Sequence, residues 1–473
     1  MLRWSSTAVA LAAWALAACT VGPTFERPQT TDAVAYTSES TNIRDQQLVA
    51  GESPPDEWWT LFHAAALDAT MRQALDGNRS LAAASANLAQ AREAVNAATG
   101  ELYPQVTLDA GTGRQKYGAK FSGPITQDPF TYFSIGPSVR YLFDYTGGQR
   151  RAVEEQQALA DEQAYRLRAA QLSVTGNVAQ QAIAIAATRR QIAVLEDLLA
   201  EDRKNVTLVQ TAFDAGTVTR VDLLSAQSQL ANDQTLLPPL HQQLSVARHA
   251  LSILVGKAPA QWAPPDFDTA DIQLPQSLPV SVPSELAHRR PDILAAEAQL
   301  HAATAAVGVT TSRLYPQIDI SASISQESTR LEHLFDGSSL AWSLVGGVSA
   351  PLFNGGTLRA QNRAAQDAMR AAAAQYEETV LQAFGQVADV LTALQHDAEL
   401  LDAQRNALDT SEANLKLTRE SYSVGNVGIL QVLDAERLLS QARLGYARAE
   451  AQRYQDTAQL LLALGGNQAV VGE

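Results

Sequence analysis

The stretch Leu102-Tyr103-Pro104-Gln105 occurs twice in this chain, the second time as Leu314-Tyr315-Pro316-Gln317. Two further landmarks recur in the same order: Phe143-Asp144 as Phe353-Asn354, and Phe213-Asp214-Ala215-Gly216 as Tyr422-Ser423-Val424-Gly425. The three offsets are 212, 210 and 209 residues. Matched landmarks at a nearly constant spacing are the sign of an internal duplication. The sequence therefore predicts two copies of one structural unit.

Each copy carries a hydrophobic residue at every seventh position. The two series are Val178, Ile185, Ile192, Leu199, Val206, Phe213 and Val387, Leu394, Leu401, Leu408, Leu415, Tyr422. Sustained heptads predict long coiled-coil helices, here over 148–214 and 357–424, each about 100 Å long at 1.5 Å per residue. Gly216 and Gly425 end these helices in turns, and return helices follow over 221–254 and 430–464.

Alternating apolar and polar residues follow each Leu-Tyr-Pro-Gln stretch, whose proline ends the preceding helix. They predict a β-hairpin over 106–143 and a second pair of strands over 318–353, four strands in all. The predicted organisation is a signal peptide (1–18), a polar tether (19–56), a first repeat (57–255), a proline-rich linker (256–283), a second repeat (284–466) and a C-terminal tail (467–473).

The predicted signal peptide ends in Leu16-Ala17-Ala18-Cys19, and Cys19 is the only cysteine in the sequence. This tetrapeptide resembles the bacterial lipoprotein signal, which implies S-diacylglycerol and N-palmitoyl groups on Cys19 as the first mature residue. An ordinary secretory cleavage site with an incidental cysteine is the alternative. Thr20 follows rather than Asp, so by the same resemblance we expect the outer membrane.

Composition argues against several function classes. A net charge of −15 with no basic run disfavours nucleic acid as a partner. The glycine pairs are not followed by Gly-Lys-Ser/Thr, no His-x-x-x-His spacing occurs, and the strand serines have no matching His/Asp arrangement. We expect no enzyme activity, no catalytic or metal site, and no cofactor beyond the lipid on Cys19.

After the signal peptide, no stretch is apolar enough for a transmembrane helix, so we expect any membrane span to be a closed β-barrel. Single-chain barrels need at least about eight strands, so four strands per chain require partner chains. The sequence thus predicts an oligomer.

Nearly the whole mature chain resembles the outer membrane factor (TolC-like) family, in particular its efflux lipoprotein branch of the NodT type. The matching stretches are Trp58-Trp59-Thr60-Leu61-Phe62, Arg289-Arg290-Pro291-Asp292-Ile293 with Glu297, Leu314-Tyr315-Pro316-Gln317, Pro351-Leu352-Phe353-Asn354-Gly355-Gly356, Asp434-Ala435 and Ala463-Leu464-Gly465-Gly466.

The resemblance implies an α+β membrane protein: a homotrimer with a twelve-stranded outer-membrane β-barrel, anchored by its lipid, and an α-helical barrel that extends into the periplasm of a Gram-negative bacterium. Its implied partners are outer-membrane lipid, a periplasmic adaptor (membrane fusion) protein and an inner-membrane RND transporter. The implied function is passive export of drugs and toxic small molecules in a tripartite efflux system.

A duct of this kind needs a gate, which we expect beyond the glycine turns. Leu430, Asp434 and Arg437 fall at i, i+4 and i+7, on one helix face. Three-fold repetition would give a leucine constriction and a cation-favouring carboxylate ring. The alternative is that Asp434 and Arg437 form only a solvated intrahelical pair.

The resemblance places aperture residues at Leu430 and Asp434 and latch residues at Asp222 and Tyr422. Val427 and Gln431 depart from the TolC pattern, so a salt-linked latch and a double aspartate ring are not implied. We expect the adaptor to dock at the hairpin tips, around Gly216, Arg220 and Gly425.

Two other functions are also compatible with the sequence. One is a periplasmic coiled-coil scaffold or adaptor lipoprotein, which accounts for the helices and Cys19 but not for the duplicated strands. The other is a duct for type I protein secretion. Substrate, adaptor and pump are not encoded in any motif of the sequence.

Overall fold

A computed structural model of the chain describes residues 20–29, 35–37, 43–116 and 128–465. The chain divides into two compact units, Met1–Pro28 with Asn87–Ala164 and Ala295–Glu377, and Gln29–Ala86 with Tyr165–Leu294 and Glu378–Glu473. Each unit takes segments from both halves of the duplicated sequence. The repeat boundary is therefore not a boundary between compact units.

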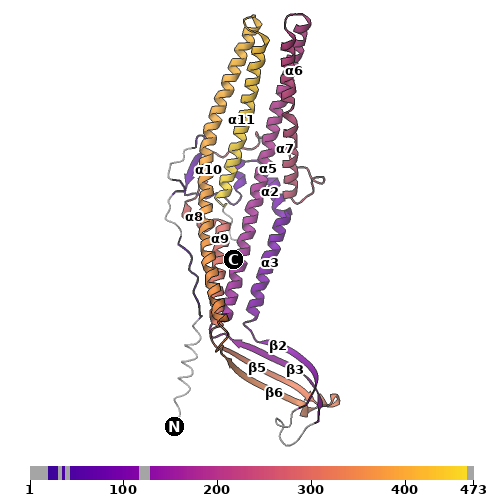
Figure 1. Cartoon of the computed structure of the whole chain (residues 1–473), viewed down its shortest axis with the longest axis vertical. Coiled ribbons are helices and arrows are strands. Elements are labelled where there is room, and N and C mark those ends of the chain that lie inside the picture. The colour runs from indigo at the N-terminus through magenta and orange to yellow at the C-terminus, as the bar shows by residue number, and fades with distance from the viewer. Residues whose placement is uncertain (1–19, 30–34, 38–42, 117–127, 466–473) are drawn as a thin grey trace. The chain divides into compact units, whose positions relative to one another are not determined.

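The first unit contains a four-stranded antiparallel sheet with the order β2-β3-β5-β6 (Figure 1). The strands are β2 (Gln105–Gln115), β3 (Phe130–Phe143), β5 (Gln317–Ser328) and β6 (Leu340–Ser349), with short 3-10 helices η2 (Leu331–His333) and η3 (Gly337–Ser339) before β6. The two repeats meet where β3 pairs with β5, for example at Val139 opposite Ala322. One continuous sheet results from the two predicted strand pairs.

The helix that precedes the sheet is broken at the same place in each repeat. α2 (Ala65–Gly77) stops before Asn78, whose Oδ1 accepts from the backbone N–H of Ser80 at 2.9 Å and begins α3 (Arg79–Gly100). In the second repeat α8 (Pro283–Arg289) stops before Arg290, and α9 (Pro291–Ser312) begins at Pro291. An asparagine cap in one repeat and a proline in the other restart the helix.

The long helices have nearly the predicted bounds: α5 is Gly148–Asp214 and α10 is Thr357–Ser423. The second return helix, α11 (Ile429–Ala463), is continuous. The prediction of a single return helix over 221–254 is wrong, because α6 (Arg220–Gln234) ends before α7 (Leu237–Leu254) begins. Pro238 and Pro239 lie in the first turn of α7, and their rings and missing N–H groups prevent the helix from running through.

The second unit contains a short parallel pair of strands that the sequence did not indicate, β1 (Gln47–Ala50) with β4 (Ser277–Val280). They tie the predicted tether to the proline-rich linker. The core of this unit forms around the 3-10 helix η1 (Trp58–Phe62). Its fully buried large side chains include Trp58, Phe62, Leu67, Met71, Ile185 and Leu251.

Among the described residues, none of the helices is both long and apolar enough to cross a membrane. The predicted α+β class is confirmed, with helix predominant.

Candidate functional site

The four-stranded sheet has one apolar face. Residues paired directly across neighbouring strands share a face, so the register places Val106, Val139, Ala322 and Leu344 together. The face also includes Leu108, Ile135, Tyr141, Phe143, Ile318, Ile320, Ile324, Leu340, Trp342 and Val348. Trp342 is 75% exposed and Leu108 is 72% exposed. An apolar surface of this extent is unusual in a protein that faces only water.

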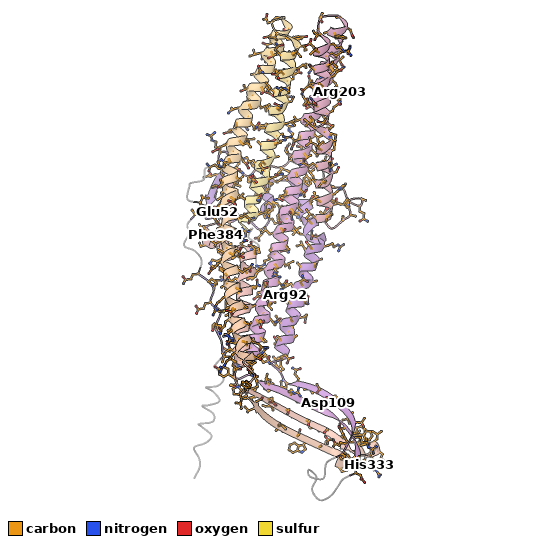
Figure 2. All side chains as sticks on the ribbon, in the orientation of Figure 1. Glu52, Arg92, Asp109, Arg203, His333 and Phe384 are labelled. Atoms are coloured by element: carbon orange, nitrogen blue, oxygen red, sulfur yellow. The ribbon has the colours of Figure 1, made fainter. Side chains whose placement is uncertain are left out.

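The opposite face of the sheet is mainly polar, although it also carries Leu142 and Val345. Ser138 Oγ donates to Asp109 Oδ2 at 2.7 Å, and the Thr107 and Ser138 hydroxyls lie 2.8 Å apart; Asp109 is labelled in Figure 2. On the other strand pair, Ser323 and Ser343 are joined by a hydroxyl hydrogen bond of 2.8 Å. Alternation of apolar and polar side chains in every strand gives a sheet suited to lipid on one side and to water on the other.

The second unit presents two helical hairpins, α5–α6 and α10–α11, with tip turns at 215–219 and 424–428 (Figure 1). Gly216 and Gly425 have φ of +75° and +80°, the left-handed region that glycine adopts without a steric penalty. Beyond each glycine a backbone N–H bonds back to the helix, from Thr217 to Ala212 and from Asn426 to Ser421, both at 2.9 Å. These are the hydrogen bonds of a Schellman C-cap.

A small hydrophobic cluster joins the two hairpins behind these turns. It contains Val209 of α5, Leu223 and Ala226 of α6, Leu415 of α10, and Ile429, Val432, Ala435 and Leu439 of α11. All four helices contribute, so the hairpins are packed against each other within one chain.

The predicted gate residues lie on α11 just beyond the second tip turn. Leu430 is 45% exposed, although its neighbour Ile429 is buried in the cluster. Arg437 donates to Asp434 Oδ1 at 2.6 Å, and both side chains are exposed. Within one chain these two residues therefore form an intrahelical pair on an exposed face. Their proposed contacts across a three-fold axis remain a prediction.

The two residues expected to form a latch, Asp222 and Tyr422, lie on different helices, α6 and α10. Asp222 accepts from the backbone N–H of Thr219 at 2.7 Å, and its own N–H donates to the Thr219 hydroxyl, which makes a capping box at the start of α6. Tyr422 is exposed in the last turn of α10. The spacing of Thr219 and Asp222 in the sequence is that of a capping box, and it could have predicted this local role. Arg220 is exposed at the start of α6.

A buried polar network that the sequence did not predict lies behind the tips. Glu436 of α11 is 7% exposed and accepts from Asn205 Nδ2 of α5. Arg419 of α10 donates to Glu436 Oε1 at 2.7 Å and lies 3.6 Å from Glu201 of α5. A hydrogen bond from Lys204 lowers the pKa of Glu201, which keeps that carboxylate charged beside Arg419. The signal in the sequence was a glutamate among the apolar, inward-facing positions of α11.

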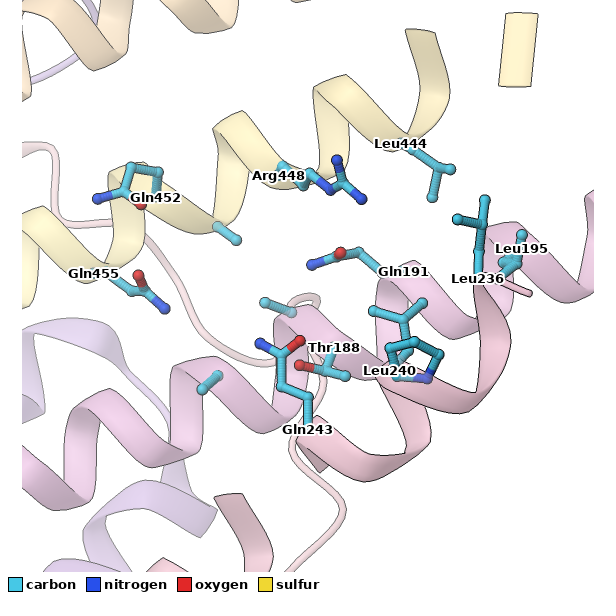
Figure 3. A pocket seen from close by; sticks show the side chains of 14 residues that line it. Thr188, Gln191, Leu195, Leu236, Leu240, Gln243, Leu444, Arg448, Gln452 and Gln455 are labelled. Carbon is cyan, nitrogen blue, oxygen red and sulfur yellow. The ribbon is translucent and has the colours of Figure 1, made fainter. Parts of the chain in front are cut away.

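A cavity of about 530 Å³ lies between α5, α7 and α11 (Figure 3). Its polar groups are the side chains of Thr188, Gln191, Gln243, Arg448, Gln452 and Gln455. Figure 3 shows the four carboxamides among them, those of Gln191, Gln243, Gln452 and Gln455, on facing helices. The cavity is neutral to positive in character.

Within the described parts of the chain, no group of three or more His, Cys, Asp and Glu side chains is arranged to hold a metal ion. The predicted lipidation site, Cys19, lies outside the described residues.

The chain is similar in sequence and in structure to known proteins. The model of the outer membrane efflux protein family matches residues 70–257 and 282–466. The pyoverdine export outer membrane protein OpmQ of Pseudomonas aeruginosa is 30% identical over 89% of this chain and 90% of its own length. The probable outer membrane lipoprotein SilC of Salmonella typhimurium is 26% identical over 86% and 87%. The structure of the outer-membrane channel OprN superposes with a TM-score of 0.85 at 28% identity, covering 95% of this chain and 99% of that one.

Proposed function

This chain belongs to the outer membrane efflux protein family, and we propose on that basis that it is the passive outer-membrane duct of a tripartite efflux system. The observation that carries the proposal is the sheet with an exposed apolar face on all four strands and a hydrogen-bonded polar face behind it. A periplasmic scaffold is surrounded by water, so an exposed apolar face on its sheet would be unfavourable. A channel wall between lipid and water requires one.

Three copies of the chain complete the channel. β2 pairs only with β3 and β6 pairs only with β5 among the described strands, so each sheet has two free edges. Repeating a head-to-tail contact about a three-fold axis joins β6 of one copy to β2 of the next. The resulting closed sheet of twelve strands leaves no edge unpaired in the membrane.

The helical hairpins form the periplasmic end of the duct and carry its gate. With three-fold symmetry, Leu430 contributes a hydrophobic constriction and Asp434 a ring of carboxylates that attracts cations. The network of Glu436, Arg419 and Asn205 holds the two hairpins of each copy together just behind that constriction. Opening then requires the hairpins to separate or rotate.

The partners that fit this arrangement are a periplasmic adaptor and an inner-membrane RND transporter. The exposed tip turns around Gly216, Arg220 and Gly425 offer the adaptor a helical surface on which its own helices can pack. The transporter supplies the energy and selects the cargo, which we infer to be small molecules, including drugs and toxic compounds.

We also propose that Cys19 carries the S-diacylglycerol and N-palmitoyl groups of an outer-membrane lipoprotein. Metabolic labelling with radioactive palmitate should mark the wild-type chain and leave Cys19→Ser unlabelled. Equal labelling of both would disprove acylation at this residue.

The experiment that tests the proposed function is drug accumulation in a Gram-negative host deleted for its own outer-membrane channels. Expression of this chain with its adaptor and pump should lower intracellular drug levels, and the pump and adaptor alone should not. A chain that instead restores secretion of a protein substrate would be a type I secretion duct. A chain with neither activity that stays soluble without its lipid would be a scaffold.

A further inference from the structure

Each helical hairpin contains one aspartate that faces another carboxyl group inside the protein. In the first hairpin Asp202 of α5, 5% exposed, faces Asp233 of α6. In the second, Asp397 of α10, 8% exposed, faces Asp456 of α11. The pairs are not equivalent by the sequence duplication, because residues 209 positions away from Asp202 and Asp233 are Ser411 and Ala442. The two pairs therefore occupy different positions of the duplicated unit.

In each pair, one carboxyl oxygen has no hydrogen-bond donor. The Oδ2 atoms of Asp202 and Asp397 are shielded from solvent and have no hydrogen-bond partner. Their partner carboxyls each receive one amide from four residues earlier on the same helix, Gln229 to Asp233 at 2.6 Å and Gln452 to Asp456 at 2.9 Å. Ionised carboxylates are acceptors only, so two of them in contact can bond to each other only through a proton.

The surrounding charges do not replace that proton. In the first hairpin the carboxyl groups of Glu436 on α11 and of the neighbouring Glu201 act on Asp202 in the same direction as Asp233. The cations there, Arg419 and Lys204, bond to Glu436 and Glu201 rather than to Asp202. Asp233 lies one residue before the end of α6, where the helix dipole disfavours a second negative charge.

In the second hairpin the cation that acts on Asp397 is Arg453 of α11, which is buried. Its guanidinium is directed to the N-terminal segment: it donates to the backbone carbonyl of Arg44 and to Gln46 Oε1, and it lies 3.7 Å from Asp45. The Arg44 side chain is itself paired with Asp402 of α10 at 2.7 Å. Arg453 therefore reduces the repulsion between Asp397 and Asp456 without bonding to Asp397.

We propose that each helical hairpin binds one proton between its two aspartates, Asp202 with Asp233 and Asp397 with Asp456, and that this proton fastens the return helix to the long helix. Loss of the proton leaves two carboxylates in contact in a poorly solvated place, and their repulsion pushes the helices apart. Burial, with the neighbouring carboxyl second, raises the pKa of Asp202 and of Asp397 to about 7. The shared proton is therefore lost, and the contact between the two helices weakens, as the pH rises through neutrality.

The test is infrared spectroscopy of the purified full-length trimer, which detects the carbonyl stretch of protonated carboxylic acids. Between about pH 5 and about pH 9 the wild type should lose such a signal with a midpoint about 7, far above the ordinary aspartate value. Asp202→Asn and Asp397→Asn should each remove part of the transition and together remove it entirely. Asp409→Asn, at an exposed position of α10, is the matched control and should leave it unchanged.

Hydrogen exchange of the return helices gives a second readout. After correction for the intrinsic pH dependence of exchange, α6 should open more above neutral pH in the wild type and not in Asp202→Asn or Asp233→Asn. A transition only near the ordinary aspartate pKa, or one that persists in the double variant, would overturn the proposal. The proton sites do not depend on the export function. A negative result for the proton sites therefore does not contradict the proposed function, and a negative result in the drug-accumulation experiment does not contradict the proton sites.

Discussion

Arg419 of α10 donates to Oε1 of Glu436 on α11 at 2.7 Å, and Glu436 also accepts from Asn205 of α5. One buried carboxylate therefore joins three helices that belong to both hairpins. Buried charges are stable only when paired, so this contact ties the position of one hairpin to that of the other. It lies directly behind the predicted constriction at Leu430.

Removal of Arg419 should loosen that connection. Arg419→Ala leaves the Glu436 carboxylate with Asn205 alone, a loss of about 1–3 kcal/mol for an under-satisfied buried group. We expect a lower thermal unfolding temperature and a larger mean single-channel conductance in a planar bilayer. Arg443→Ala is the control, because Arg443 and Glu412 form an exposed pair at 3.4 Å. Identical conductance in the two variants would mean that Arg419 does not restrain the gate.

The proposed carboxylate ring can be tested at Asp434. Asp434→Ala should increase conductance and weaken cation preference, because three negative charges at the constriction are lost. Leu430→Ala should increase conductance with cation preference retained. Asp409→Ala removes an exposed aspartate from α10 far from the tip turns and should change neither quantity. If Asp434→Ala behaves like this control, Asp434 and Arg437 are only the intrahelical pair seen within one chain.

Adjacent residues on β6 test the two faces of the sheet. Trp342→Lys places a charge on the apolar face, with an expected cost of roughly 2–4 kcal/mol near the bilayer centre. Ser343→Lys places the same charge on the polar face, next to Ser323. We expect the first variant to yield far less heat-resistant trimer in outer-membrane fractions and the second to assemble. Equal assembly would contradict a lipid-facing role for the Trp342 face.

Two glycine substitutions should act in opposite directions. Gly425→Ala forces a side chain into the left-handed region at φ +80° and should destabilise the tip by about 1–2 kcal/mol. Gly385 lies inside α10 with open space around its missing Cβ, so Gly385→Ala should stabilise that helix by up to about 1 kcal/mol. Hydrogen exchange at the tip and thermal unfolding separate the two effects. A Gly425→Ala chain as well protected as the wild type would show that the turn tolerates strain.

The raised carboxyl pKa values predict the pH dependence of stability. Between the ordinary aspartate value of 3.8 and about 7, folded Asp202 and Asp397 keep protons that the unfolded chain has released. Stability should therefore be highest at the acid end of this interval, fall as the pH rises through it, and level off above about 7. Denaturant titrations of wild type and the Asp202→Asn/Asp397→Asn chain across this range provide the check. The double variant should show a shallower fall.

Local signals were enough for most of the secondary structure. The heptads ending at Phe213 and Tyr422 predicted the long helices, and Gly216 and Gly425 predicted the turns, because each depends on neighbours within a few residues. The break before α7 was missed although Pro238 and Pro239 mark it. The β1–β4 pair was missed because Gln47 and Ser277 meet only in the folded chain.

The duplicated unit, the alternation of the strands and the place of the turns follow from the amino-acid sequence alone, because periodicity, proline and glycine act over short distances. Which polar side chains meet depends instead on how the helices pack. In the sequence, nothing distinguishes Glu436 from other helical glutamates, and its burial comes from the packing of α5 and α10 against α11. Likewise, only the fold brings Asp202 opposite Asp233. Burial and pairing are properties of packed helices, and they arise from contacts between residues far apart in the chain.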